Sequence, residues 1–160
     1  MWTKKTILVL VACLLSCSVM AGDTGGDLAI IVAKSSSLAN LSSAELSKIF
    51  RAEKAKGPDG VKFVLAMRET GSDERAAALA GIYKMSEADY GKYFLQATFV
   101  GLVQSAPRQI SSAAAMRQFV ASVPGGIGYV RSSDVDDSVK AVTIDGHPPG
   151  DPAYPLKLKP

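Results

Sequence analysis

The chain has 160 residues, of which 48% are hydrophobic and 21% are charged, and its formal net charge is +3. This composition is that of an ordinary globular domain and excludes a disordered or fibrous chain. Acidic and basic residues are interspersed, with no basic stripe of the kind that binds DNA or RNA, so we expect no nucleic-acid partner.

Residues 1–21 have the layout of a secretory signal peptide. Two lysines precede the apolar run 7–15, and small residues then lead to Ala21. The apolar run is shorter than the roughly 20 residues that a membrane-spanning helix needs. We therefore expect cleavage after Ala21, a mature domain over residues 22–160, and a periplasmic or secreted location.

Both cysteines, Cys13 and Cys17, lie in this first segment. Cleavage after Ala21 would leave a mature protein without disulfides and without a thiol nucleophile. The alternative is lipidation, because residues 10–13, LVAC, and 14–17, LLSC, both resemble the bacterial lipoprotein box, whose cysteine becomes acylated. Plain secretion is the first expectation, and a lipoprotein anchored at Cys17 or Cys13 is the second.

Strands and helices are predicted to alternate along the rest of the chain. Residues 28–33, LAIIVA, form a continuous apolar run, which is typical of a strand buried on both faces in the middle of a sheet. Ser42 has a glutamate three residues on, and this capping box predicts a helix that begins near Ser43. The helix should end before the turn 57–60, GPDG, and residues 61–67 then predict a second strand.

Three more helices are predicted after this strand. Each has a serine or threonine at its expected N-cap, which is Thr70 or Ser72, then Ser86, then Ser111 or Ser112. The helix after Ser86 carries apolar residues at helical spacing, and this pattern favours core packing over an aromatic ligand site. These residues are Tyr90, Tyr93, Phe94 and Ala97.

Two further strands are predicted, over residues 127–130 and about 139–144. The tail 146–160 is rich in proline and cannot form a regular helix. The alternation of strands with helices predicts an α/β fold, with a layered mixed β-sheet flanked by helices.

Enzyme chemistry finds little support in the sequence. His147 is the one histidine, and it lies in a Pro- and Gly-rich stretch that favours a surface turn over a general base. The chain has no Cys or His cluster with metal-ligand spacing, no Walker loop and no G-x-S-x-G elbow. The acidic run 134–137, DVDD, is typical of a solvated turn, with weak cation binding as the alternative. We therefore expect no enzyme, no cofactor and no metal.

The best candidate for a binding site is the loop 68–72, RETGS, between the second strand and the second helix. A strand-to-helix loop presents backbone N–H groups and the positive end of the helix dipole, which suits an oxyanion. Arg68 would add a charged two-pronged donor, Thr70 and Ser72 would add hydroxyls, and Gly71 would allow close backbone approach. The residues alone support an equal alternative, in which Ser72 is an N-cap and Arg68 is a surface charge.

Four motifs occur in an order that resembles the phosphate-binding proteins of ABC transporters, which are type 2 periplasmic binding proteins. Residues 41–50, LSSAELSKIF, resemble the LT-x-x-x-L-x-x-IF helix of this family, and residues 68–75, RETGSDER, resemble its R-x-x-G-S-G-T-R loop. Residues 123–130, VPGGIGYV, are similar to V-x-x-x-PGAIGYV, and Asp145-Gly146 with the later YPL are similar to DG…YPL. The matches extend over nearly the whole mature chain.

The resemblance implies a lobe of the periplasmic-binding-protein type, a binding rather than a catalytic function, and phosphate or another small anion as the ligand. It carries over Arg68, Gly71 and Ser72 as ligand-binding residues. An inner-membrane permease or another envelope protein is the implied partner.

The end of the first strand departs from the family pattern. Residues 33–37, AKSSS, stand where the family has N-P-x-N. Ser35 and Ser36 still offer hydroxyls at this position, so we include them among the expected ligand-binding residues.

Two further departures favour a different function. Asp73 and Glu74 stand where the family has Gly and Thr, and two carboxylates in a first helical turn satisfy the helix dipole and repel an incoming anion. Only a few residues separate the expected signal peptide from the first strand, so the earlier lobe of full-length members is expected to be missing. The alternative function is therefore a ligand-free envelope adaptor or partner-binding protein built on a single lobe.

Export can be tested by intact-mass measurement. Expressed in a Gram-negative host, the protein should leave the cytoplasm shortened at its N-terminus, because the two lysines and the apolar run 7–15 form a signal. A product beginning at Gly22 supports plain secretion, and acylation at Cys17 or Cys13 supports the lipoprotein. An uncleaved cytoplasmic product contradicts both.

Overall fold

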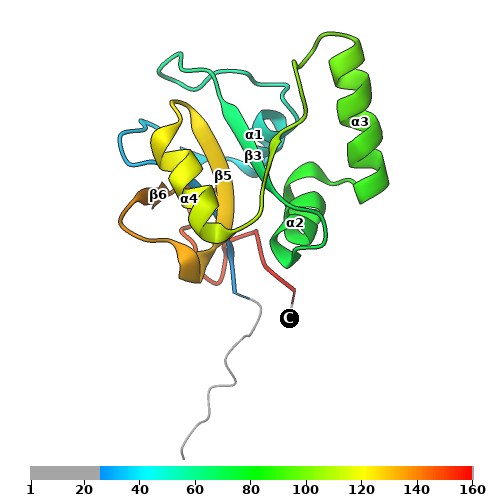
Figure 1. The fold of residues 1–160 in the computed structure, drawn as a ribbon. Coiled ribbons are helices and arrows are strands. Elements are labelled where there is room, and N and C mark those ends of the chain that lie inside the picture. The colour runs from blue at the N-terminus through cyan, green and yellow to red at the C-terminus, as the bar shows by residue number, and fades with distance from the viewer. Residues whose placement is uncertain (1–25, 160) are drawn as a thin grey trace, which may run out of the picture.

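The computed structural model describes residues 26–159, so the expected signal peptide and both cysteines lie outside the described part. Helices lie on both faces of a mixed sheet (Figure 1). The helical segments are α1 (Ser43–Phe50), α2 (Asp73–Ala78) with its π-helical continuation η1 (Leu79–Tyr83), α3 (Glu87–Phe99), α4 (Ala113–Ser122) and the 3₁₀ turn η2 (Ser132–Asp134). The strands are β1 (Leu28–Ala33), β2 (Asn40–Leu41), β3 (Val64–Arg68), β4 (Arg108–Ile110), β5 (Gly126–Arg131), β6 (Val139–Ala141) and β7 (Thr143–Ile144).

Five strands form the main sheet in the order β4-β3-β5-β1-β6. Strand β3 is parallel to both of its neighbours, β4 and β5. Strand β1 is antiparallel to both of its neighbours, β5 and β6, and β2 and β7 form a separate parallel pair. The predicted α/β fold with a layered mixed sheet is confirmed.

Strand β1 is buried on both faces, as its unbroken apolar run predicts. Leu28, Ile30 and Val32 belong to the larger core, which also contains buried residues of α1, η1 and α3. Ile31 belongs to the smaller core on the other face, which α4 covers. Because β1 also has a strand on each side, it is an interior strand of the sheet.

All four α-helices begin after a serine whose side chain accepts a backbone N–H of the first turn. These N-caps are Ser42, Ser72, Ser86 and Ser112. At α1 the capping box is complete, because the Glu45 carboxylate also accepts the backbone N–H of Ser42. The sequence left two candidate caps open for α2 and for α4, and the structure selects Ser72 and Ser112.

The start of the second predicted strand, 61–67, is corrected. Strand β3 begins at Val64, because the residues before it pair with residues 55–57 in a short hairpin. The Phe63 N–H donates to the carbonyl of Ala55 at 2.9 Å, and Lys62 is bridged to Lys56. Residues 61–63 continue the apolar pattern of β3 in the sequence, but they pair locally and do not belong to the main sheet. The predicted strand therefore began too early.

The predicted strand 139–144 is also corrected, since it is broken at Val142. Strand β6 pairs with β1, whereas β7 pairs with β2 in the second sheet. Strands β2 and β4 were not predicted, because each has only two or three residues and carries no alternating apolar pattern.

The proline-rich tail forms no regular helix, as predicted, but it contributes to the core. Tyr154, Leu156 and Leu158 are buried, and the Tyr154 hydroxyl donates to the carbonyl of Leu28 at 2.9 Å. Asp27 is also buried and accepts hydrogen bonds from Lys157 Nζ at 2.7 Å and from a tail backbone N–H. The tail is thereby tied to the start of β1.

The capping box of α1 can be tested by Ser42→Ala. The substitution removes the side-chain acceptor for the Glu45 N–H, and it should lower the free energy of unfolding by about 1 kcal/mol. Denaturant melts of the wild type and the variant measure this difference. Ser43→Ala gives the comparison with the loss of a serine that does not cap the helix. Its hydroxyl bonds to Asp145, so this variant measures a different contact. An unchanged melt for Ser42→Ala would show that the cap does not stabilise the helix.

Candidate functional site

Three parallel strands, β4, β3 and β5, end at the same edge of the sheet, and most of the candidate residues gather there. Arg68 is the last residue of β3, Ser111 directly follows β4, and Arg131 is the last residue of β5. Helices α2 and α4 both begin at this edge. The carboxyl ends of parallel strands are where ligands bind in open α/β sheets.

Arg68 lies under this edge and is only 9% exposed, so it is not a surface charge. Its Nη2 donates to the carbonyl of Ser111 at 3.2 Å, while its Nε is buried without a hydrogen-bond partner. Its backbone N–H donates to the hydroxyl of Tyr129 at 3.1 Å, which fixes the end of the strand. A buried donor on a charged group without a partner is costly, so it calls for a ligand or water.

The loop after Arg68 offers fewer unengaged hydrogen-bond donors than its sequence suggested, because the Ser72 hydroxyl is used within the chain. Gly71 adopts φ +91°, the left-handed region that favours glycine, and allows the chain to turn into α2. The Ser72 hydroxyl donates to the carbonyl of Glu69 at 3.0 Å and accepts the Arg75 N–H at 3.2 Å. Ser72 therefore acts as the N-cap, whereas Thr70 and Gly71 are exposed on the loop.

Arg131 holds both carboxylates of the first turn of α2. Its Nε donates to Glu74 Oε1 and its Nη2 donates to Asp73 Oδ2, each at 2.9 Å. Glu74 is 8% exposed, so its carboxylate lies inside the edge, beside the helix start where an anion would be expected. The carboxylates and the arginine neutralise one another in this position.

The ionisation of Glu74 follows from these contacts. Burial raises the pKa of Glu74. A hydrogen bond from its own backbone N–H, the hydrogen bond from Arg131 and the nearby charge of Arg68 together lower the pKa by more than burial raises it, so it lies below the usual 4.5. The same contact raises the pKa of Arg131. Glu74 is therefore a carboxylate at neutral pH and interacts with two arginines.

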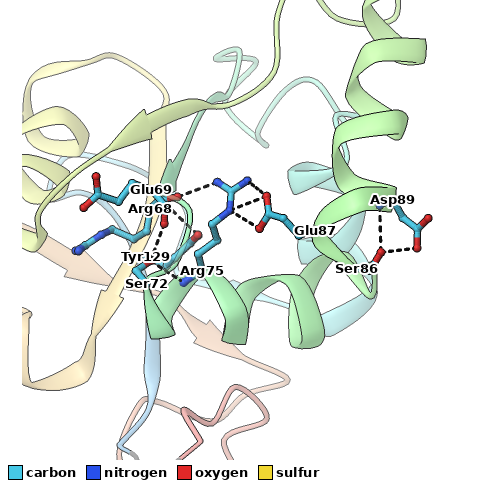
Figure 2. A network of polar contacts seen from close by, with 8 residues as sticks. All are labelled: Arg68, Glu69, Ser72, Arg75, Ser86, Glu87, Asp89 and Tyr129. Carbon is cyan, nitrogen blue, oxygen red and sulfur yellow. Dashed lines mark hydrogen bonds and ion pairs between the residues drawn. The ribbon is translucent and has the colours of Figure 1, made fainter.

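Arg75, the last arginine of the motif, points away from the edge. Figure 2 shows its guanidinium turned toward Glu87 at the start of α3, while the Arg68 side chain extends in the opposite direction. Arg75 Nε lies 2.9 Å from Glu87 Oε2, and its Nη1 donates to the carbonyl of Arg68 at 2.9 Å. Arg75 is 3% exposed and lies over the ring of Tyr90. It therefore joins α2, α3 and β3 and is not available to a ligand.

Ser35 and Ser36 lie at the opposite end of the sheet. Because β1 is antiparallel to β5, the end of β1 lies beside the start of β5, with Val32 opposite Ile127. The two serines line a small cavity of about 190 Å³, and the carbonyl of Ser36 accepts a bond from Lys140 Nζ at 2.6 Å. The structure does not bring them together with the loop after Arg68.

The other polar features of the sequence lie on the surface. In the acidic run, Asp136 pairs with Arg117 at 2.8 Å and Asp137 lies 3.9 Å from Lys34. His147 lies in a surface turn, where its ring is 3.3 Å from Asp151. Within residues 26–159, no group of three His, Cys, Asp or Glu residues could hold a metal ion, and no helix is long and apolar enough to cross a membrane.

Neither Arg131 nor Ser111 was identified as a site residue from the sequence. Arg131 directly follows the predicted strand 127–130 and belongs to no motif, and Ser111 was considered only as a helix cap. Their closeness to Arg68 follows from the parallel pairing of β3 with β4 and β5, which no local sequence pattern encodes.

The fold is similar to that of several phosphate-binding proteins. A candidate phosphate ABC transporter substrate-binding protein with bound phosphate from Clostridium perfringens superposes with a TM-score of 0.68 at 19% identity, over 83% of this chain and 53% of that one. An ABC-type phosphate transport receptor from Vibrio cholerae has a TM-score of 0.61 at 20% identity, over 83% and 54%. PstS from Borrelia burgdorferi has a TM-score of 0.61 at 16% identity, over 84% and 55%.

These similarities establish the fold. The chain spans about half the length of the solved structures it matches. No family model matches the chain, and no curated protein matches it in sequence.

The contact between Arg75 and Glu87 can be tested by Glu87→Gln. The substitution removes the charge that compensates buried Arg75, and it should lower the free energy of unfolding at neutral pH by about 1–3 kcal/mol. A hydrogen bond from Arg75 lowers the pKa of Glu87, so this stabilisation is full above the usual Glu pKa and is lost as the pH falls through the lowered value. Denaturant melts of the two proteins should therefore differ at neutral pH and converge at acidic pH, below the lowered pKa of Glu87.

Asp89→Asn is the matched control, because Asp89 lies in the same helical turn but is exposed and bonds only locally to Ser86. Equal destabilisation by both substitutions would contradict a specific role for Glu87.

Proposed function

We propose that this chain is an exported solute-binding-type protein that binds phosphate or another small oxyanion at the shared edge of β4, β3 and β5. The observation that carries the proposal is Arg68, which is buried at this edge with a free Nε between the starts of α2 and α4. Guanidinium groups and helix N-termini both favour oxyanions. The fold of known phosphate-binding proteins adds support, and an inner-membrane permease or another envelope protein would be the partner.

Binding by the wild-type protein should be weak, because Glu74 competes with the ligand. Its carboxylate already accepts the Nε of Arg131 and lies near Arg68, so an incoming anion must displace it or tolerate its charge. Ser72 is also engaged as a cap. We therefore propose a site that is complete in its cations but partly occupied by the protein's own carboxylate.

The same ion pairs favour the second candidate function, a ligand-free envelope adaptor. In that case Asp73 and Glu74 permanently close the edge, and Arg131 serves only to stabilise the fold. The two candidates differ in one measurable property, which is whether removing the carboxylates produces an anion site.

The double substitution Asp73→Gly with Glu74→Thr should raise the affinity for phosphate. It removes two negative charges, restores the loop pattern of the resembling family and frees the Nε and Nη2 of Arg131 for a ligand. Calorimetric titration with phosphate, sulfate and a simple carboxylate measures the change in affinity. The titrations are made at low salt, because salt screens the charges of a surface anion site and weakens binding.

Asp136→Asn with Asp137→Asn is the matched control, because it makes the same change in net charge at an exposed turn away from the edge. If the double substitution at the edge leaves phosphate affinity unchanged while the fold stays intact, the edge is not an anion site and the adaptor function is favoured. A rise shared by the control would indicate a general charge effect and would also contradict the proposal.

The role of Arg68 can be tested in the same background. Arg68→Ala should weaken phosphate binding by about 1.5–3 kcal/mol, the range for a hydrogen bond to a charged group. Because Arg68 also bonds to Ser111, a thermal melt must accompany the titration. Unchanged phosphate affinity in a folded variant would show that the guanidinium does not contact the ligand.

A further inference from the structure

The end of α3 exposes a group of apolar side chains that the proposed function does not use. We call this group the apolar tip, and it consists of Leu95, Phe99, Val100 and Leu102, which are 75%, 90%, 66% and 53% exposed. Helix α3 stands at the side of the domain, and its last turn lies at the end away from the C-terminus (Figure 1). Large apolar side chains exposed together mark an interaction surface.

The chain around the apolar tip carries no charge. Residues 93–107 contain no Asp, Glu, Lys or Arg, although much of this segment is on the surface. Leu95 and Phe99 are four residues apart and therefore lie on one face of α3. The inner face of the same helix, with Tyr90 and Phe94, packs into the core. The side chains of the apolar tip therefore do not belong to the hydrophobic core.

A cavity of about 460 Å³ adjoins the apolar tip. Leu102 lines it together with apolar residues of α1, β3 and α3, and Lys54 and Lys62 lie in the same wall. Lys54 pairs with Glu45 at 3.0 Å, so its charge is compensated. Lys62 makes no ion pair among the residues that the structure describes.

Lys56 lies directly opposite Lys62 in the hairpin before β3. Like charges opposite each other on paired strands are destabilising, and neither lysine has an ion-pair partner within residues 26–159. Lys92, also exposed and without such a partner, precedes Leu95 by three residues on α3. Lys62 in the cavity wall, Lys56 opposite it and Lys92 one helical turn before Leu95 thus leave positive charge on this side of the domain that no ion pair within residues 26–159 balances.

We propose that the apolar tip and the lysines beside it dock the domain on an anionic phospholipid surface. Apolar side chains that enter the interfacial region, with lysines near the headgroups, are the features of peripheral membrane binding. A second copy of this chain fits less well, because a two-fold contact would bring the lysines of both copies together. Phe99 protrudes with 90% of its surface exposed, and a fluid bilayer accommodates such a projection without a preformed groove.

Vesicle co-sedimentation tests this proposal. The protein, with one and the same N-terminus in every variant, should bind vesicles of phosphatidylglycerol and phosphatidylcholine more tightly than vesicles of phosphatidylcholine alone. Leu95→Ser with Phe99→Ser should weaken this binding by about tenfold or more, since both side chains lose their apolar burial. Lys56→Glu with Lys62→Glu should remove the preference for the anionic vesicles, and high salt should reduce it in the wild type.

Lys84→Glu with Lys159→Glu is the matched control, since it makes the same change in net charge at exposed positions outside the apolar tip and should retain binding. Because all four tip and hairpin positions are exposed, thermal melts should show that the variants remain folded. Vesicle binding that the serine variant leaves unchanged, or that shows no preference for phosphatidylglycerol, overturns the proposal. A wild-type protein that is dimeric by light scattering and becomes monomeric in the serine variant also overturns it, in favour of a self-association face.

Discussion

The pairing of β1 with β5 and β6 is the constraint on which the rest of the domain depends. Leu28, Ile30 and Val32 face one core and Ile31 faces the other, so this one strand joins both layers of helices to the sheet. The tail is anchored to it as well, through the bond from the Tyr154 hydroxyl to the Leu28 carbonyl. Its antiparallel direction also decides which loops meet, because it carries the end of β1 away from the carboxyl ends of the three parallel strands.

At the edge where those parallel strands end, the residues of the 68–75 loop make contacts within the chain that an anion would otherwise make. Of the two arginines in the 68–75 motif, Arg68 stays under the edge with a free Nε, whereas Arg75 is turned toward Glu87 and holds the helices together. Arg131 then compensates the carboxylates that enter the edge from α2. The arginines that the proposed anion site requires are therefore present, but their charge is balanced within the chain. This balance is the reason that two functions are proposed for the edge, a weak oxyanion site and a ligand-free adaptor.

Charge is distributed differently at the other end of the domain. There Lys56, Lys62 and Lys92 have no ion-pair partners among the described residues, whereas three carboxylates at the helix starts are paired with buried or half-buried arginines. These carboxylates are Asp73 and Glu74 of α2 and Glu87 of α3. Ion pairs inside an edge balance its charge, and unpaired lysines on the side of the domain that exposes apolar groups favour association with an anionic surface. The two ends of the domain are thus suited to different tasks.

The sequence by itself determined the local features of this protein. The apolar run 28–33 indicated a strand buried on both faces, the serine and threonine caps placed the helix starts to within two residues, and the prolines excluded a regular helix in the tail, because each depends on neighbouring residues alone. The tertiary structure decided which of these elements meet. It separated Ser35 and Ser36 from the loop after Arg68, and it brought Arg131 to Glu74 across 57 residues of chain. Those outcomes depend on strand order and direction, which arise from the packing of the whole sheet and leave no local pattern in the sequence.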